Sequence, residues 1–148
     1  MEIKSIIFPT DFSEGSAQAL KYAVDFTQKY GAKLYVLHVI YDVAKASGWY
    51  VPHVSMDALY KDIQEGAKKE LDNFGVKELE GIKNIERIVE TGVPYQEIMS
   101  FATKIKADLI IIGTHGRTGI DRILFGSTAA QVVRNAPCPV LTVRIPKY

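Results

Sequence analysis

The stretch that most restricts the fold is Gly113–Ser127, a glycine-rich segment between an apolar run and a helical pattern. Residues 107–112 are apolar and rich in β-branched side chains, which predicts a buried strand. Thr128–Asn135 has helical apolar spacing, and Ser127 is a candidate N-cap. The expected order is therefore strand, glycine loop and helix start. That order suits an anion, because glycine allows close backbone approach and a helix N-terminus offers unpaired N–H groups.

The glycine spacing is Gly113-x2-Gly116-x9-Gly126-Ser127. It lacks the Gly-Lys-Ser/Thr ending of a Walker A loop, and it is not the dinucleotide pattern G-x-G-x-x-G. Taken alone, three glycines could simply mark turns between a strand and a helix. Arg117 and Arg122 lie in the loop and could add charge-assisted hydrogen bonds to an anion. The alternative for Arg117 is a solvated loop charge, whereas Arg122 is expected to be exposed or paired with a neighbouring acid such as Asp121.

Strand and helix patterns alternate along the whole chain. Strands are expected at 4–8, 33–40, 84–90, 107–112 and 140–145, and helices at 13–30, 55–74, 94–106 and 128–135. Such alternation predicts parallel strands joined by helical crossovers. The expected fold is a single α/β domain over residues 1–148, a doubly wound five-stranded parallel sheet with about four helices.

Local signals place the helix ends and the buried faces. Ser13 is the expected N-cap of the first helix, Gly31 its C-terminal stop, and Pro94 the first residue of the third helix. The segment 41–54, with Trp49 and His53, is irregular and is expected to pack as a loop or to cover the pocket. Each of the first three helices has an expected buried face. These faces are Ala17, Leu20, Val24 and Thr27 in the helix at 13–30; Leu59, Ile63, Ala67, Leu71 and Phe74 in the helix at 55–74; and Ile98, Phe101, Ala102 and Ile105 in the helix at 94–106.

Composition narrows the function classes. A chain of 148 residues with 47% hydrophobic residues can bury a core without disulfides, and its single cysteine, Cys138, is expected to be a small buried residue. The net charge of +1 gives no electrostatic footprint for nucleic acid or an anionic membrane. No signal peptide and no apolar run of roughly 20 residues is found. A cytoplasmic protein is therefore expected, with no nucleic-acid or membrane partner.

The glycine spacing resembles the nucleotide-binding signature G-x2-G-x9-G-[ST] of the universal stress protein family. The resemblance covers the whole chain, from the Pro9-Thr10-Asp11 turn after the first strand to Pro137-Cys138-Pro139 before the last. It implies one universal stress protein domain, with a Rossmann-like fold similar to that of the adenine nucleotide α-hydrolases. All motif glycines and the final serine are present, so the chain resembles the branch of the family that binds ATP.

The resemblance also implies roles for individual residues. An Mg²⁺ or Mn²⁺ ion is expected with the nucleotide, and no catalytic residue is expected. Phosphates would be held by Gly116, Arg117, Gly126, Ser127 and Thr128; Asp11 and Gly113 would lie near the ribose or the metal; and Pro9, Thr10, Val39 and Ile112 would form walls for the adenine.

Two of these residues keep simpler alternatives. Asp11 could cap the first helix, a role compatible with ribose binding. His115 could suggest phosphoryl chemistry, but no general base accompanies it, so backbone positioning or a phosphate contact is the preferred hypothesis. His38 is expected to be a hydrogen-bonded histidine of the core.

The favoured function is a nucleotide-dependent regulatory or stress-response protein, with a slow ATPase or another adenine-nucleotide enzyme of the same α/β group as the alternative. The Ser-Gly-Gly-x-Asp-Ser loop of nucleotide-activating synthetases and the His-x-Gly-His motif of adenylyl transferases are both absent. A flavodoxin-like carrier of FMN would need its phosphate loop after the first strand, where this chain has Pro-Thr-Asp. An apolar strand at Val140–Ile145 near the C-terminus would invite pairing with a second copy if it forms the edge of the sheet. Members of the family that this chain resembles form homodimers through that strand, so a homodimer is expected, unless the strand lies inside its own sheet or Lys147 and Tyr148 shield its edge. A protein partner is also expected, and the residues do not identify it.

Overall fold

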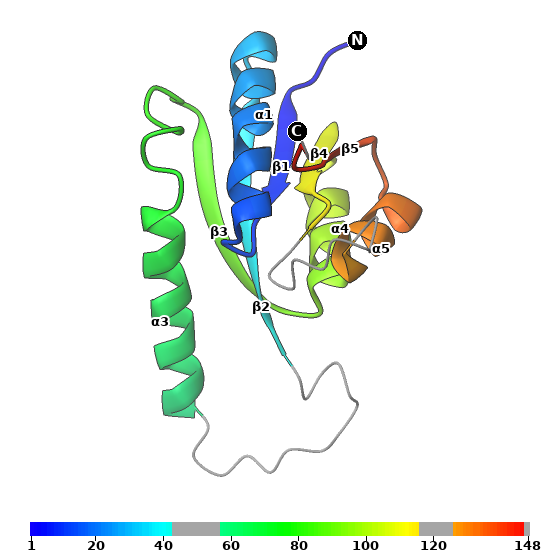
Figure 1. The fold of residues 1–148 in the computed structure, drawn as a ribbon. Coiled ribbons are helices and arrows are strands. Elements are labelled where there is room, and N and C mark those ends of the chain that lie inside the picture. The colour runs from blue at the N-terminus through cyan, green and yellow to red at the C-terminus, as the bar shows by residue number, and fades with distance from the viewer. Residues whose placement is uncertain (43–56, 116–125, 147–148) are drawn as a thin grey trace.

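The computed structural model describes residues 1–42, 57–115 and 126–146 (Figure 1). Its strands are β1 (Ser5–Pro9), β2 (Lys33–Tyr41), β3 (Ile85–Gly92), β4 (Leu109–Gly113) and β5 (Val140–Val143). Its helices are α1 (Glu14–Tyr30), α3 (Asp57–Asn73), α4 (Pro94–Ile105) and α5 (Ser127–Asn135). Within these ranges no helix is long and apolar enough to cross a bilayer.

All five strands are parallel, and they lie in the order β3-β2-β1-β4-β5. The chain first builds outward from β1 to β3 and then resumes on the other side of β1 with β4 and β5. Helices α1 and α3 cover one face of the sheet, and α4 and α5 cover the other (Figure 1). The predicted doubly wound, five-stranded α/β fold is confirmed, and its change in strand order lies between β1 and β4.

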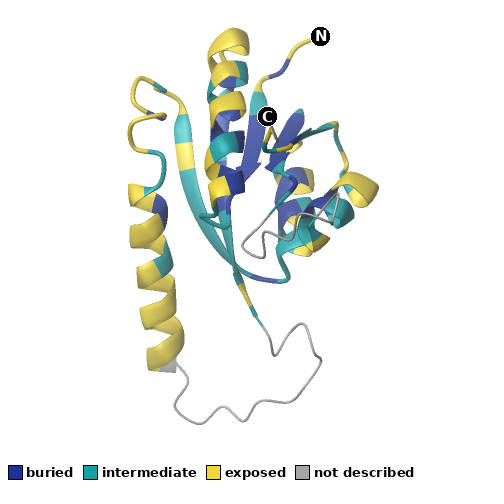
Figure 2. Cartoon of the chain, viewed as in Figure 1, coloured by how far each residue is buried: buried dark blue, intermediate teal, exposed yellow. Residues whose placement is uncertain are grey.

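The sheet separates two hydrophobic clusters. Phe8, Leu34 and Ile111 pack with α1 and α3 on one face, while Ile7, Leu37 and Ile110 pack with α4 and α5 on the other. Successive residues of a strand point to opposite faces, so each central strand contributes to both clusters. Figure 2 accordingly shows the buried residues concentrated in the middle strands and on the inner faces of the helices.

The predicted ends of the first and third helices are confirmed. Ser13 is the N-cap of α1, and its hydroxyl accepts a hydrogen bond from the Ser16 N–H. Gly31 ends α1 in the left-handed conformation, with φ of 64°. Pro94 occupies the start of α4, where its missing N–H costs no intrahelical bond.

The predicted buried face of α1 was partly wrong. Ala17 is exposed and Val24 only half-buried, whereas Ala19 and Ala23 are fully buried beside Leu20. Alanine is compatible with either side of a helix, so the apolar pattern left the rotation of α1 about its axis uncertain. Small side chains on this face allow α1 to lie close to the sheet.

The predicted buried stripe of α3 was wrong in its N-terminal half. Leu59 and Ile63 are 51% and 42% exposed, and only Leu71 of the predicted stripe is fully buried. The cause is visible in Figure 1 and Figure 2, where α3 continues past the carboxyl end of the sheet and its outer part is mostly exposed. A helical repeat identifies an apolar face but not how far the sheet extends beneath it.

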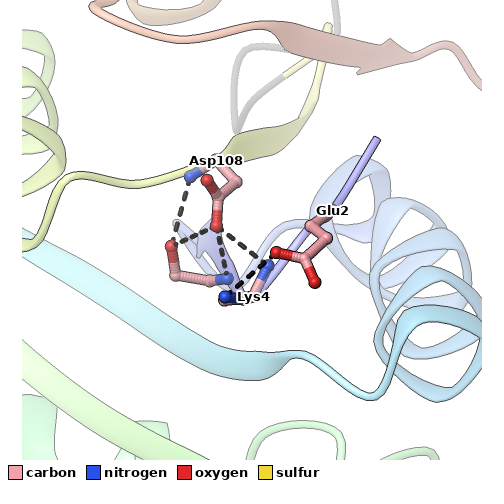
Figure 3. A network of polar contacts seen from close by, with 4 residues as sticks. Glu2, Lys4 and Asp108 are labelled. Carbon is pink, nitrogen blue, oxygen red and sulfur yellow. Dashed lines mark hydrogen bonds and ion pairs between the residues drawn. The ribbon is translucent and has the colours of Figure 1, made fainter.

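Several predicted strand ends shifted by one to two residues. The strand expected at 107–112 begins at Leu109, the last strand ends at Val143 rather than Ile145, and β3 continues to Gly92. Asp108 is absent from β4 because its side chain and backbone are bonded to the start of β1 (Figure 3). Strand ends depend on such side-chain contacts, which apolar patterns do not encode.

Asp108 joins β1 to β4 at the amino end of the sheet (Figure 3). Its Oδ2 accepts hydrogen bonds from the backbone N–H groups of Lys4 and Ser5 at 2.9 and 3.0 Å, and from the Ser5 hydroxyl at 3.0 Å. These donors, led by the Lys4 N–H, lower the pKa of the Asp108 carboxyl and outweigh its desolvation. The ionised carboxylate therefore favours the folded state.

We expect Asp108→Asn to lower the free energy of unfolding by about 1 kcal/mol at pH 7, a modest value because Asp108 is only half-buried. A carboxyl whose pKa is lowered by folding stabilises the protein above its unfolded pKa, about 3.9, and this contribution is lost as the pH falls through its folded pKa. Urea denaturation at several pH values should show the difference between wild type and variant shrinking as the pH falls below the unfolded pKa and vanishing below the folded pKa.

A matched control is Glu2→Gln, which removes the exposed ion pair between Glu2 and Lys4 next to the same strand. Exposed pairs contribute little, so its unfolding free energy should stay within about 0.5 kcal/mol of wild type at every pH. A pH-independent effect of Asp108→Asn would show that the charge is not what Asp108 contributes.

Candidate functional site

A cavity of about 240 Å³ lies at the carboxyl ends of the central strands. It is placed where the strand order changes between β1 and β4, the position at which open α/β sheets bind ligands. Its lining residues come from the ends of three strands and the starts of three helices: Pro9, Thr10, Asp11, Ser16, Leu37, Val39, Pro94, Ile98, Gly113, Thr114, His115, Gly126, Ser127, Thr128 and Ala129.

The cavity has an apolar side and a polar side. Leu37 and Val39 of β2 lie with Pro94 and Ile98 of α4, and Pro9 of β1 completes this apolar wall. Hydroxyl, carboxylate and imidazole groups follow β1 and β4 and begin α5. A flat apolar group and an anionic group could thus be held at once, since ligand sites combine apolar walls with a few placed polar groups.

The turn after β1 carries the only carboxylate that lines the cavity among the described residues, that of Asp11. Asp11 Oδ1 accepts a hydrogen bond from the Ser13 N–H at 3.0 Å, and Thr10 Oγ1 accepts one from the Phe12 N–H at 3.0 Å. The N-cap of α1 is Ser13, not Asp11. Asp11 therefore supports the residue that caps the helix while its carboxylate remains part of the cavity wall.

The ends of β4 and α1 meet through backbone atoms. A Cβ built on Gly15 would overlap the carbonyl oxygen of His115, and one built on Gly113 would lie 3.0 Å from the Gly15 carbonyl oxygen. Glycine is required at position 15 for this approach, whatever its backbone angles. The segment after β4 is also anchored on its other side, because the Thr114 N–H donates to the Val143 carbonyl at 2.9 Å.

The start of α5 lines the cavity. The predicted N-cap at Ser127 was wrong: Gly126, in an extended conformation (φ −62°, ψ 159°), is the N-cap, and Ser127 is already helical. Gly126 offers no side-chain cap, and its own N–H donates to the Thr114 carbonyl at 2.6 Å. Because no side chain of the described residues caps this helix, its first-turn N–H groups can bind a ligand there, and the helix dipole favours an anion.

Nine of the predicted site residues lie together around the cavity: Pro9, Thr10, Asp11, Val39, Gly113, His115, Gly126, Ser127 and Thr128. Ile112 does not line it; this residue is 6% exposed and packs in the cluster beneath α4 and α5. Gly116 and Arg117, and likewise Arg122, Trp49 and His53, fall outside the described residues.

Sequence reasoning missed the contribution of α4. Pro94 and Ile98 lie one turn apart at the start of this helix, where they complete the apolar wall. The only available signal was topological: a helix that follows an edge strand and packs over the sheet begins at the carboxyl edge, next to the site. Leu37, Ser16, Thr114 and Ala129 were missed as well, and the last two lie directly beside predicted residues.

His38 and His115 have hydrogen-bond partners at the carboxyl end of the sheet, whereas Cys138 lies at its amino end, before β5. His115 Nδ1 lies 2.8 Å from Thr114 Oγ1, and His38 Nδ1 lies 2.8 Å from the Thr10 carbonyl oxygen, which confirms that His38 is hydrogen-bonded. Cys138 is half-buried, and its burial raises the pKa of its thiol, so it is a packing residue rather than a thiolate nucleophile. Across the described ranges, no three His, Cys, Asp or Glu side chains group to hold a metal ion by themselves.

Comparison with known proteins decides the family. The sequence model of the universal stress protein family matches residues 2–144. The chain belongs to the universal stress protein family. Universal stress protein MJ0531 of Methanocaldococcus jannaschii is 38% identical over an alignment covering 97% of this chain and 84% of that protein.

Solved structures of the family agree with the fold. Protein MJ0577 of the same organism, 32% identical, superposes with a TM-score of 0.86 over 100% of both chains. A universal stress protein from Archaeoglobus fulgidus, solved in complex with dAMP, is 25% identical, with a TM-score of 0.61 over 96% of this chain and 98% of that chain.

The contact between Gly15 and His115 makes a stability prediction. Gly15→Ala should lower the free energy of unfolding by about 2 kcal/mol, because the added methyl group displaces a backbone that is fixed on both sides. Gly66→Ala is the matched control: Gly66 is also helical and nothing lies within 4 Å of its built Cβ, so alanine should stabilise by about 0.5 kcal/mol or more. Urea denaturation measures both, and equal stabilisation by the two substitutions would refute the contact.

Proposed function

We propose that this universal stress protein binds ATP in the cavity and acts as a nucleotide-dependent regulatory or stress-response protein. The observation that carries the proposal is the joining of an apolar wall, the Asp11 carboxylate and the open N-terminus of α5 around one cavity. These features suit a base, ribose hydroxyls and phosphates respectively. The dAMP complex of the Archaeoglobus fulgidus relative supports an adenine nucleotide as the ligand class.

Individual roles follow from this arrangement. We assign the adenine to the wall formed by Pro9 and Val39, now extended by Leu37, Pro94 and Ile98. Asp11 and Gly113 are assigned to the ribose, with Thr10 between base and ribose. The phosphates are assigned to Gly126, Ser127 and Thr128, with His115 beside them; Gly116 and Arg117 keep their proposed phosphate roles from the sequence motif alone.

A divalent cation fits this site only together with the nucleotide. The described residues offer one carboxylate at the cavity, Asp11, and Mg²⁺ is commonly bound by one or two carboxylates plus substrate phosphates and water. We therefore propose that Mg²⁺ or Mn²⁺ enters with ATP, with Asp11 as its protein ligand. The ion would neutralise phosphate charge and orient the phosphate chain.

Slow ATP hydrolysis is the alternative activity. It requires only a water molecule with access to the bound triphosphate. The one imidazole lining the described part of the cavity, that of His115, has its Nδ1 beside the Thr114 hydroxyl rather than a carboxylate. This arrangement supports nucleotide binding as the main role. The protein would return to its nucleotide-free form by releasing ATP or by hydrolysing it slowly.

Nucleotide identity is tested first on the purified protein. We expect ATP to be released on denaturation and identified by chromatography, or to bind the stripped protein with measurable heat in the presence of Mg²⁺. Absence of both would mean that the glycine loop is a structural feature in this chain.

We also propose a homodimer formed along β5, the edge strand next to β4. The backbone carbonyls of Pro139 and Val143 accept hydrogen bonds from β4, at Ile110 and Thr114. Because backbone groups alternate in direction along a strand, those of Val140 and Thr142 point to the open edge. An open edge of this kind can pair with the same strand of a second copy.

Gly126→Val should abolish ATP binding, a loss of at least about a hundredfold in affinity, because its side chain would block the approach of phosphate to the backbone. The extended backbone of Gly126 suits any residue, so the free energy of unfolding should stay within about 1 kcal/mol of wild type. Calorimetric titration and urea denaturation measure the two quantities, and unchanged affinity would overturn the phosphate assignment.

Asp11→Ala should weaken ATP binding about tenfold, the usual size of one lost hydrogen bond to a charged group. The same calorimetric titration measures this effect. Collapse of the fold instead would assign Asp11 to the support of Ser13 alone.

Thr142→Pro should convert the homodimer to a monomer, because proline removes the outward N–H while the bonds from β5 to β4 remain. Thr142→Val is the matched control, since it keeps the N–H and the branched shape and should leave the dimer intact. Size-exclusion chromatography with light scattering gives the masses. A dimeric Thr142→Pro protein, or a monomeric wild type, would contradict the β5 interface.

A further inference from the structure

His38 lies on the face of the sheet opposite the cavity. Its neighbours in β2, Leu37 and Val39, line the cavity on the side of α4 and α5. The His38 ring instead stacks on the ring of Phe12, which packs against the cluster beneath α1 and α3. This alternation is the ordinary geometry of a strand. His38 can therefore affect a ligand only through other residues.

The turn from Thr10 to Ser13 contains a residue in an unfavourable conformation. Phe12 has φ of 64°, in the left-handed region that bulky residues seldom adopt, at a cost of roughly 1 kcal/mol or more. Two hydrogen bonds lie within the turn: the Phe12 N–H donates to Thr10 Oγ1, and the Ser13 N–H donates to Asp11 Oδ1. Both join residues of the turn to each other and do not fix the turn to the sheet. External contacts must hold the turn against the sheet.

His38 supplies two such contacts, one on each side of Asp11. Its Nδ1 lies 2.8 Å from the carbonyl oxygen of Thr10, and because a carbonyl oxygen can only accept, Nδ1 carries the proton. Its ring centroid lies 4.2 Å from that of Phe12, with 29° between the ring planes. The Thr10 carbonyl and the Asp11 N–H belong to one rigid peptide plane, so this hydrogen bond fixes the orientation of the chain entering Asp11.

We propose that His38 is a positioning residue that holds the Asp11 carboxylate in place for the ribose hydroxyls of a bound nucleotide. The inference rests on the proposed binding of ATP and adds to it a residue outside the cavity. A second bond, from the Thr10 N–H to the Leu37 carbonyl at 2.9 Å, fixes the peptide before Thr10 but not the one after it. The Nδ1–H donor of His38 holds that following peptide.

The test compares ATP with 2′,3′-dideoxy-ATP, which lacks both ribose hydroxyls. Wild type should prefer ATP by about tenfold, the value of a hydrogen bond to a carboxylate. His38→Leu should reduce the preference to less than about twofold, because ATP loses its ribose contact in addition to any loss through the cation bound by Asp11, which both nucleotides share. His38→Asn keeps an N–H donor near the position of Nδ1 and should restore most of the preference.

Equal losses for both nucleotides in His38→Leu would overturn the proposal, since a purely structural role does not distinguish them. So would an unchanged preference in His38→Leu, or a His38→Asn variant that behaves like His38→Leu. Urea denaturation of all three proteins verifies that each is folded in the titrations.

A second measurement uses no nucleotide. Nitrogen-15 NMR of the wild type should show the His38 ring protonated at Nδ1, and the amide signals of residues 10–13 should move in His38→Leu and return in His38→Asn. A neutral ring protonated at Nε2 would overturn the proposal. If wild type binds neither nucleotide, the proposed function fails and the ribose role fails with it, whereas the NMR result still decides whether His38 orders the turn.

Discussion

The approach of backbone to backbone between β4 and α1 is the constraint on which the site depends. Where β4 ends, the His115 carbonyl lies against Gly15 so closely that any side chain there would overlap it. A Cβ built on Gly113, two residues earlier, would lie 3.0 Å from the Gly15 carbonyl oxygen. This contact places the start of the glycine loop beside the first turn of α1. The turn that carries Asp11 and the segment that carries His115 then line one cavity.

The sequence predicted the architecture well because its strongest signals are local. Ser13 and Gly31 mark the ends of α1 through chemistry within one helical turn, and buried strands such as Leu109–Gly113 are short apolar runs. The errors concern relations between elements. Whether Leu59 is buried depends on where the sheet ends, and whether Ala17 or Ala19 faces the sheet depends on how α1 is rotated. Neither relation is encoded in a single segment.

The same division applies to the site. The glycine spacing pointed to Gly113 and Gly126, which both line the cavity, and to the helix after Gly126, while the turn after β1 was found from its own residues. Pro94 and Ile98 were missed because nothing in their segment differs from an ordinary amphipathic helix start. Only the parallel topology brings that helix to the carboxyl edge. Ile112 points to the same face of the sheet as the cavity, but it is buried in the cluster beneath α4 and α5 and does not line the cavity.

The two faces of the sheet contribute to the site in different ways. On the face of α4 and α5, apolar side chains shape the cavity, and a wrong side chain there would alter contact with the ligand directly. On the face of α1 and α3, the rings of His38 and Phe74 pack against Phe12, a residue of the turn, on the side of the sheet away from the cavity. The left-handed conformation of Phe12 is tolerated because its ring packs against His38 and Phe74 and because His38 also hydrogen-bonds the nearby Thr10 carbonyl. If the cavity binds a nucleotide as proposed, substitutions behind the turn should alter ligand selectivity without altering the shape of the cavity.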